Sequence, residues 1–316
     1  MSVSRKASST HDGLANVPLR GVLLMVATVV AFSAQDASLK WLSAGFGFAQ
    51  IMFFGRILAV PLALGLALRS GGLGQIKSRR PWGHALRATL MIATMLCFVY
   101  ALKHLPIADT IAIGFAAPLF MTALSVPFLN EKVGPRRWAA VLIGFGGVMV
   151  ILQPSGTGFG LAALAALSSA ATYAMLFITS RKLTATESGP CLIFWNSFAM
   201  LVCAGIAMPW DFRMPAGIDI LVFAGTAVFG AVGQLLMTEA FRYGEVSLLA
   251  PIEYSALIWA TLFGWLLWND LPSLTVVAGA AIIIASSGYI LHRETRAVKV
   301  KVAIPVPVAG AGPIDT

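Results

Sequence analysis

Long apolar runs separated by short polar segments restrict what this chain can fold into. A helix that crosses a bilayer needs about 20 apolar residues, and ten runs of about this length follow one another along the sequence. They cover residues 19–41, 48–68, 84–102, 107–129, 136–152, 159–180, 190–208, 218–241, 245–268 and 274–291. The sequence therefore predicts an all-α integral membrane protein with ten transmembrane helices.

The charge content agrees with a membrane protein. Charged residues make up 11% of the chain, whereas a soluble domain carries about 25%. The net charge of +9 comes from Lys and Arg residues between the apolar runs, not from a basic face interleaved with aromatic residues. This distribution argues against nucleic acid as a partner and leaves the lipid bilayer as the expected surroundings.

The basic residues also predict an orientation. If the N-terminus lies in the cytosol, Lys40, Lys103 and Arg213 fall outside and Arg56 falls within a span, while the other Lys and Arg residues fall inside. Basic residues are enriched in the cytoplasmic loops of membrane proteins. We therefore expect a multi-pass protein of the cell inner membrane with both termini in the cytoplasm.

The ends of the chain differ from its apolar body. Residues 1–18 are polar, and residues 292–316 are basic and then rich in Pro and Gly. Both compositions are typical of disorder, so we expect a disordered cytosolic N-terminus and a disordered basic cytosolic tail.

No sequence pattern predicts a cofactor or a metal. Cys97, Cys191 and Cys203 lie inside apolar runs without CxxC spacing, which indicates packed thiols. The Gly-rich stretch around Gly156 lacks the strand and helix of a nucleotide-binding loop, and no GxxxxGK[ST] motif occurs. Transport driven by ATP bound to this chain is therefore not expected.

An internal repeat divides the ten spans into two sets of five. When the chain is displaced by 139 residues, Lys103 aligns with Arg242 and Asn130 with Asn269. The predicted repeats cover residues 19–152 and 159–291. Because each holds an odd number of spans, the two halves must have opposite orientations. Inverted repeats are a common plan of secondary transporters, whose substrate site lies near the middle of the membrane.

Several motifs resemble one transporter family. The second span contains "FFGR", the fourth contains "APLF" and is followed by "LNE", and the ninth contains "AP", "Y" and then "WND". Over roughly residues 18–292 the chain resembles the EamA family of the drug/metabolite transporter (DMT) superfamily. The stretches "SAQDASLKWL", "QIMFFGR" and "RRPWGHALR" resemble the branch that includes riboflavin and S-adenosylmethionine uptake carriers.

The resemblance implies a secondary transporter that moves a small metabolite by alternating access. Uptake of a ring-bearing metabolite such as riboflavin is the leading expectation. Uptake of S-adenosylmethionine and export of amino acids or drugs are the alternatives, and a homodimer is left open.

Charges inside the spans are candidates for substrate binding or gating, because each is costly in a membrane. Asp36 and Lys40 share one helix face, so they form a rim ion pair or place Asp36 in an outward vestibule. Arg56 and Glu253 lie deeper, and Pro251 removes a backbone donor beside Glu253. These two either bind substrate or bridge each other. A carboxyl group at Glu253 also offers proton coupling.

Aromatic and amide side chains within the spans complete the predicted site. Rings can sandwich a planar substrate while charged groups bind its polar ends. The candidates are Phe54, Tyr100, Trp195, Gln234, Tyr254 and Trp259.

Two other classes of membrane protein fit the sequence less well. A membrane-embedded enzyme usually needs clustered His or acidic residues, but His11, His84, His104 and His292 lie near or beyond the ends of spans. A channel needs polar positions repeated along several helices, and these are sparse here. We therefore do not expect an enzyme.

Overall fold

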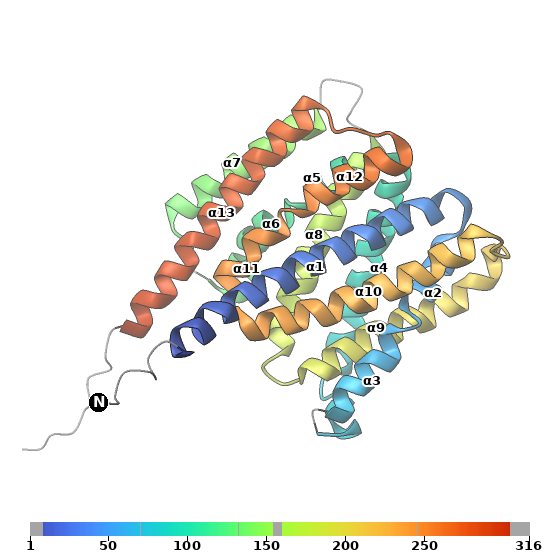
Figure 1. Ribbon diagram of the computed structural model, residues 1–316, viewed down its shortest axis with the longest axis horizontal. Coiled ribbons are helices and arrows are strands. Elements are labelled where there is room, and N and C mark those ends of the chain that lie inside the picture. Colours follow the sequence, from blue (N-terminus) through green and yellow to red (C-terminus); the bar gives the residue numbers. More distant parts are fainter. Residues whose placement is uncertain (1–8, 70, 132, 154–159, 245, 304–316) are drawn as a thin grey trace, which may run out of the picture.

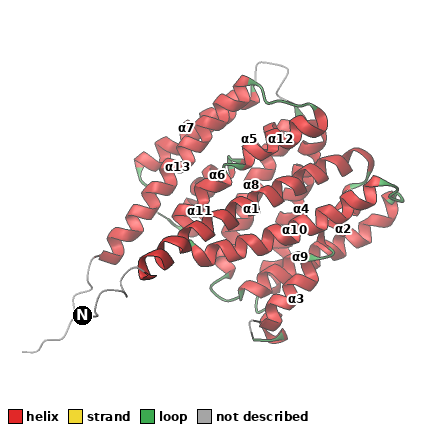
Figure 2. Ribbon diagram, viewed as in Figure 1, coloured by secondary structure: helices red, strands yellow, loops and turns green. Residues whose placement is uncertain are grey.

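The computed structural model describes residues 9–69, 71–131, 133–153, 160–244 and 246–303, and these residues form helices and loops without a strand (Figures 1 and 2). Within these described ranges, ten segments are long and apolar enough to cross a membrane. They are Leu19–Gly45, Phe48–Arg69, Pro81–His104, Ile107–Leu129, Pro135–Leu152, Leu161–Leu183, Gly189–Asp211, Ile218–Tyr243, Leu248–Trp268 and Leu274–His292. The predicted all-α fold with ten spans is confirmed.

Seven of the ten spans are built on one unbroken α-helix each, and three are broken in the middle. The unbroken helices are α1 (Ser9–Gly45), α4 (Pro81–His104), α7 (Pro135–Leu152), α8 (Leu161–Leu183), α9 (Gly189–Ala207), α10 (Ile218–Tyr243) and α13 (Leu274–Ala303). The broken spans are α2 (Phe48–Arg56) with α3 (Ala59–Arg69), α5 (Ile107–Gly114) with α6 (Ala117–Leu129), and α11 (Val246–Glu253) with α12 (Ala256–Trp268). Short 3₁₀ turns follow α3 (Leu73–Ile76) and α9 (Met208–Asp211).

The ends of the chain differ from the sequence prediction. Helix α1 already begins at Ser9, and α13 continues to Ala303, so parts of the two segments expected to be disordered are helical. These extensions prolong helices that are already nucleated within the spans, and adding a residue to an existing helix is far easier than starting one. Residues 1–8 and 304–316 and the Gly156 stretch lie outside the described residues.

The break in the fourth span recurs in the ninth at the same place. Ile107–Gly114 and Val246–Glu253 are displaced by 139 residues, and so are Ala117–Leu129 and Ala256–Trp268. Both spans end at an asparagine in the left-handed conformation, Asn130 at φ 54° and Asn269 at φ 57°. Asparagine tolerates this conformation better than most residues.

The packing of the helices repeats in the same way. Helix α1 lies along α10 (Figure 1), and their counterparts α8 and α4 also pack on each other. Helices α7 and α13 form a pair at one edge of the bundle. There Gly147 faces Gly279 so closely that a Cβ on either residue would clash with the other's carbonyl oxygen. Small residues at such crossings allow helix backbones to approach.

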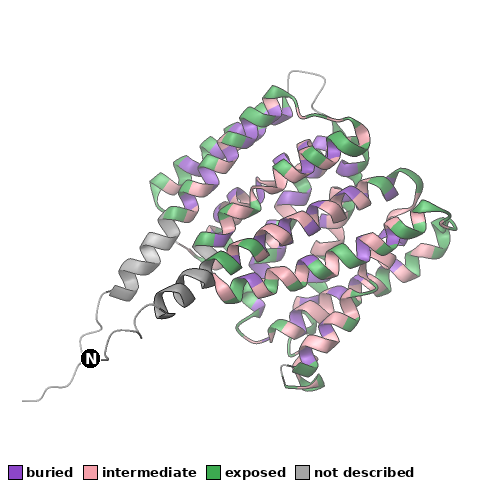
Figure 3. Cartoon of the chain, in the orientation of Figure 1, coloured by how far each residue is buried: buried purple, intermediate pink, exposed green. Residues whose placement is uncertain are grey.

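Burial follows the pattern expected of a protein surrounded by lipid. Exposed residues occur on the outer surfaces of the helices (Figure 3). On α7 they include the apolar residues Leu142 and Ile143. The cysteines differ from the prediction that all three are packed, because Cys191 is buried whereas Cys203 is exposed. Cys203 lies on the outward face of α9, where an apolar thiol needs no protein partner.

The bundle has two ends. We call the end where α1 begins and α13 finishes the terminus end, and the opposite one the far end. At the terminus end, Glu187 accepts hydrogen bonds from the backbone N–H groups of Arg79 at 2.7 Å and Arg80 at 2.8 Å. Burial acts to raise the pKa of Glu187, but these bonds and one from Cys191 outweigh it, so the pKa lies below its usual value. Glu187 thus anchors the loop before α4 to the start of α9.

Candidate functional site: a central cavity at broken helices

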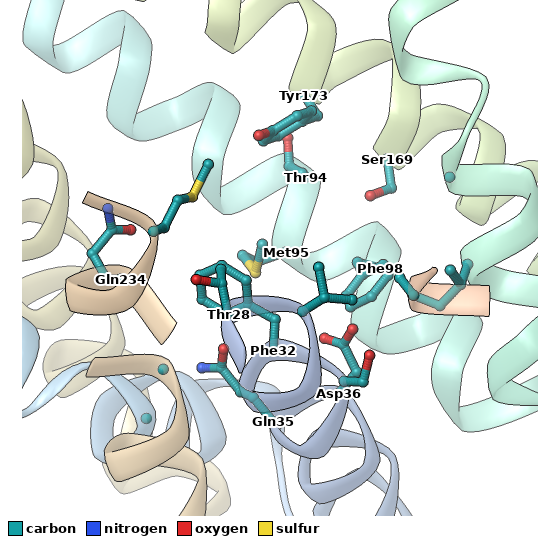
Figure 4. Close-up of a pocket in the computed structure, with 18 of the residues that line it drawn as sticks. Thr28, Phe32, Gln35, Asp36, Thr94, Met95, Phe98, Ser169, Tyr173 and Gln234 are labelled. Carbon is teal, nitrogen blue, oxygen red and sulfur yellow. The ribbon is translucent and has the colours of Figure 1, made fainter. Parts of the chain in front are cut away.

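A cavity of about 530 Å³ lies in the middle of the bundle. Its wall includes residues of α1, α4, α8 and α10, together with residues at the breaks in the second, fourth and ninth spans (Figure 4). The volume is within the range of about 300–1,000 Å³ that small-molecule sites occupy. Among the residues that the structure describes, none of those lining the cavity comes from the α7–α13 pair, so the described part of that pair is separate from the site.

The deep charges of the sequence meet at this cavity. Arg56 is the last residue of α2, Glu253 is the last residue of α11, and Asp36 lies within α1; all three line the wall. Broken helices at this depth are typical of substrate and coupling-ion sites in transporters. The carboxyl end of a helix carries partial negative charge, which favours Arg56 at its position and disfavours a carboxylate at Glu253.

These three charged side chains have no ion-pair partner among the residues that the structure describes. In particular, Arg56 and Glu253 do not form the bridge that the sequence left open as an alternative. Asp36 and Arg56 also share a smaller cavity of about 60 Å³. The charges are therefore arranged around space rather than neutralised by one another.

The rest of the wall is mainly apolar and aromatic. Phe32, Phe98, Phe115 and Tyr173 contribute rings, and Met91, Met95 and Met237 contribute thioethers. A few polar groups stand between them, and Figure 4 shows Thr28, Gln35, Thr94, Ser169 and Gln234 around the cavity. This composition is common in ligand sites, where apolar walls hold the ligand and a few polar groups orient it.

Sequence analysis missed these aromatic residues, although two signals pointed to them. Phe32 is four residues before Asp36, so helical spacing places both on one face. The repeat offset of 139 also pairs Met95 with Gln234 and Phe98 with Met237, and both members of each pair line the cavity. The repeat offset identifies a lining residue only when the equivalent residue in the other repeat is already known to line the cavity.

Lys40 lies outside the cavity, at the far end. Its Nζ is 3.7 Å from Asp270 Oδ2 and donates to the carbonyl oxygen of Leu105 at 2.5 Å. The hypothesis of an Asp36–Lys40 rim pair is therefore wrong for this structure. Asp36 and Lys40 share one helix face, but Lys40 pairs instead with Asp270, which follows α12.

The aromatic sandwich expected around the substrate is not formed by the predicted rings. Phe54 packs edge-on against Phe223 with ring centroids 5.3 Å apart, and Tyr254 packs against Phe115 at 5.2 Å. Trp195 donates to the carbonyl oxygen of Ile76 at 2.9 Å, at the terminus end. Trp259 on α12 is absent from the described lining of the central cavity.

Tyr100 belongs to a second cavity of about 290 Å³ at the far end. Its ring lies against His104 with centroids 4.3 Å apart, and Lys103 and Arg213 also line this cavity. Of the ten predicted site residues, the structure therefore brings Asp36, Arg56, Gln234 and Glu253 together at the central cavity.

Comparison with known proteins gives consistent results. The EamA-like transporter family matches residues 19–153 and 160–291. The chain is 30% identical to a riboflavin transporter of Rhizobium johnstonii, with 87% of this chain and 92% of the relative covered. It is 27% identical to an S-adenosylmethionine uptake transporter of Rickettsia bellii, covering 89% and 97%.

An exporter is also among the relatives. The chain is 27% identical to the pseudopaline exporter CntI of Pseudomonas aeruginosa, with 84% of this chain and 94% of the relative covered. One crystal structure superposes with a TM-score of 0.58 at 17% identity, covering 90% of this chain and 99% of that one. At that identity the superposition supports the fold alone.

Proposed function

Because the chain belongs to the EamA-like transporter family, we propose that it takes up a ring-bearing small metabolite, with riboflavin as the first candidate. The observation that carries this proposal is the central cavity, where rings and thioethers surround Asp36, Arg56 and Glu253. Alternating access between the two repeats would open this cavity to each side of the membrane in turn.

The wall of the cavity suits a planar ring. Phe32, Phe98, Phe115 and Tyr173 can hold it by stacked or edge-on contacts. Gln35, Thr94, Ser169 and Gln234 offer donors and acceptors for the polar groups of a ring system or its side chain. The similarity to a riboflavin transporter over most of both chains supports the same substrate class.

S-adenosylmethionine is a second candidate because of one specific feature. The cavity wall carries two carboxyl groups and one guanidinium group, and this ligand carries a sulfonium, an ammonium and a carboxylate beside its adenine ring. Arg56 would bind the carboxylate, while Asp36 and Glu253 would face the two cationic groups. The relative from Rickettsia bellii supports this candidate.

The test is uptake of labelled riboflavin and labelled S-adenosylmethionine by cells that lack carriers for both. We expect riboflavin to accumulate in cells that express the chain, and Phe98→Ala to reduce accumulation at least about tenfold by removing ring contacts. Phe54→Ala is the matched control, because Phe54 packs against Phe223 and is not among the described residues that line the cavity. Accumulation of S-adenosylmethionine alone would select the second candidate, and net loss of preloaded substrate would indicate export.

The orientation belongs to the same proposal. The distribution of basic residues supports an inner-membrane protein with cytoplasmic termini, so that the terminus end faces the cytosol. A reporter fused after Lys301 should then be cytosolic, and one inserted beside Arg213 should be external. The opposite result at either position contradicts this orientation.

A further inference from the structure

Three side chains with metal-binding atoms converge at the terminus end, away from the central cavity. His84 lies in the first turn of α4, Cys191 in the first turn of α9, and Glu187 just before α9. Cys191 Sγ is 3.7 Å from His84 Nε2 and 3.4 Å from Glu187 Oε2, and His84 Nε2 is 3.8 Å from Glu187 Oε1. All three residues are buried, with exposed fractions of 0–6%.

These spacings fit a tetrahedral zinc ion. Zinc binds thiolate sulfur at about 2.3 Å and imidazole nitrogen or carboxylate oxygen at about 2.0–2.2 Å. Tetrahedral angles at those bond lengths place the ligand atoms about 3.4–3.6 Å from one another. The separations of Cys191 Sγ from Glu187 Oε2 and from His84 Nε2, 3.4 Å and 3.7 Å, are within a few tenths of an ångström of these values. One ligand atom from each of the three residues lies within 4.8 Å of the other two.

Hydrogen bonding alone does not account for the buried imidazole of His84. Its Nδ1 has no hydrogen-bond partner among the described residues. Its Nε2 makes one long hydrogen-bond contact, 3.7 Å to Cys191 Sγ, and lies 3.8 Å from Glu187 Oε1, beyond the usual length of about 2.7–3.2 Å for an N–H···O bond. A buried polar ring with one weak hydrogen bond is costly, and a metal ion at the centre would replace the weak contact of Nε2 by a coordinate bond.

The carboxylate is already oriented by its surroundings. Glu187 Oε1 accepts from the backbone N–H groups of Arg79 and Arg80 and from the Ser78 hydroxyl. Oε2 accepts from the Cys191 thiol at 3.4 Å, and a metal ion would take the place of that proton. Groups that hold a ligand in this way raise metal affinity.

The charges around the cluster also suit a divalent cation. Metal binding would release the proton of the Cys191 thiol, and the resulting thiolate and the carboxylate of Glu187 would then supply two negative charges. The nearby Arg87 bonds instead to the Ser180 hydroxyl at 2.8 Å and the Leu192 carbonyl oxygen at 2.9 Å. The Ile76 carbonyl oxygen, 3.5 Å from Cys191 Sγ, borders the remaining side.

We propose that His84, Glu187 and Cys191 bind a divalent transition-metal ion, with zinc as the best match, which ties the loop before α4 to the start of α9. Water or the Ile76 carbonyl oxygen would take the fourth position. Sequence spacing predicted no metal site because His84 and Cys191 are 107 residues apart and no local motif contains both.

The first test is the zinc content of the purified full-length protein. The protein, in detergent and with any affinity tag removed, is equilibrated with zinc, desalted and analysed by mass spectrometry. We expect about one zinc per chain in the wild type and in Cys203→Ser, which removes an exposed thiol from the same helix. Cys191→Ser should reduce affinity more than about tenfold.

Cobalt tests the ligands directly. Added Co²⁺ should give a thiolate-to-metal charge-transfer band in the wild type and in Cys203→Ser, and no such band in Cys191→Ser. If Cys191→Ser does not fold, the wild type alone decides the question by the presence or absence of this band and by whether zinc raises its melting temperature. No band in the wild type, or equal zinc retention by the wild type and a folded Cys191→Ser, overturns the proposal.

Discussion

Helix α5 ends at Gly114 and helix α11 ends at Glu253, and these two residues occupy equivalent positions in the two halves of the molecule. Both line the central cavity. Counted from the first residues of α2 and α9, Arg56 corresponds to Ser197, which also lines the cavity. At these two pairs of positions, each half carries a charge where the other has a small neutral residue, and Asp36 adds a second charge from the first half. The backbone plan is shared, whereas the chemistry of the cavity differs between the halves.

The ends of the bundle show a second contrast. At the far end Lys40 on α1 pairs with Asp270 at 3.7 Å, and at the terminus end Arg181 on α8 pairs with Glu131 at 2.7 Å. In each pair the base lies near the end of the first helix of one half, and the acid follows the fourth span of the other. The far-end base is enclosed, with its side chain 11% exposed, whereas Arg181 is 58% exposed. Equivalent ion pairs therefore differ in environment.

The largest effect is expected from removing the charge of the second half. Glu253→Gln keeps the shape of the side chain but cannot take up or release a proton at the cavity. If Glu253 couples transport to protons, accumulation against a gradient should fall more than about tenfold while exchange of substrate across the membrane continues. Uptake and counterflow by reconstituted protein measure the two activities.

Gly114→Ala is the matched control in the first half. A Cβ there meets no atom within 4 Å, so we expect near-normal accumulation. Unchanged accumulation in Glu253→Gln would remove Glu253 from the coupling mechanism and show that the difference between Gly114 and Glu253 has no role in coupling.

The second prediction separates substrate binding from a structural bridge. A buried bridge that loses one partner costs about 3–5 kcal/mol, so single variants of Arg56 or Glu253 would be poorly folded and the double variant would recover. Because the structure shows no such pair within its described residues, we expect Arg56→Ser and Glu253→Ala to fold but to transport poorly. Melting temperature and uptake of both singles and the double measure this, and recovery of stability in the double contradicts it.

The arrangement of the spans followed from the sequence more directly than the site did. Runs of about 20 apolar residues and the matching asparagines 130 and 269 are local signals, so spans and repeat could be identified without coordinates. Depth in a span also pointed to Arg56 and Glu253. Which face of a helix meets the cavity depends on packing between distant segments, so Phe54 and Trp195 were expected in the site and Phe98 and Tyr173 were missed.

The third prediction concerns the far-end ion pair. Lys40 is enclosed and also bonds to the Leu105 carbonyl oxygen, so Asp270→Asn leaves a charge with little access to water. We expect a loss of about 1–2 kcal/mol, between the values for exposed and buried pairs. Thermal melting in detergent measures it, with Lys40→Met as the second member of a double-mutant cycle. A coupling energy near zero would show that the pair does not stabilise the far end.

The smallest effect is expected from the equivalent pair at the terminus end. Glu131 and Arg181 are closer to each other than Lys40 and Asp270 are, but Arg181 is mostly exposed and water can replace its partner. Exposed pairs contribute about 0–1 kcal/mol, so Glu131→Gln should lower stability by less than Asp270→Asn does. Its coupling with Arg181 should also weaken as salt is added, because exposed charges are screened.

The same melting experiments at low and high salt test this, with Asp270→Asn alongside. A larger loss of stability for Glu131→Gln than for Asp270→Asn would mean that distance, rather than enclosure, sets the strength of these pairs. The ion pair at the terminus end would then be the stronger of the two.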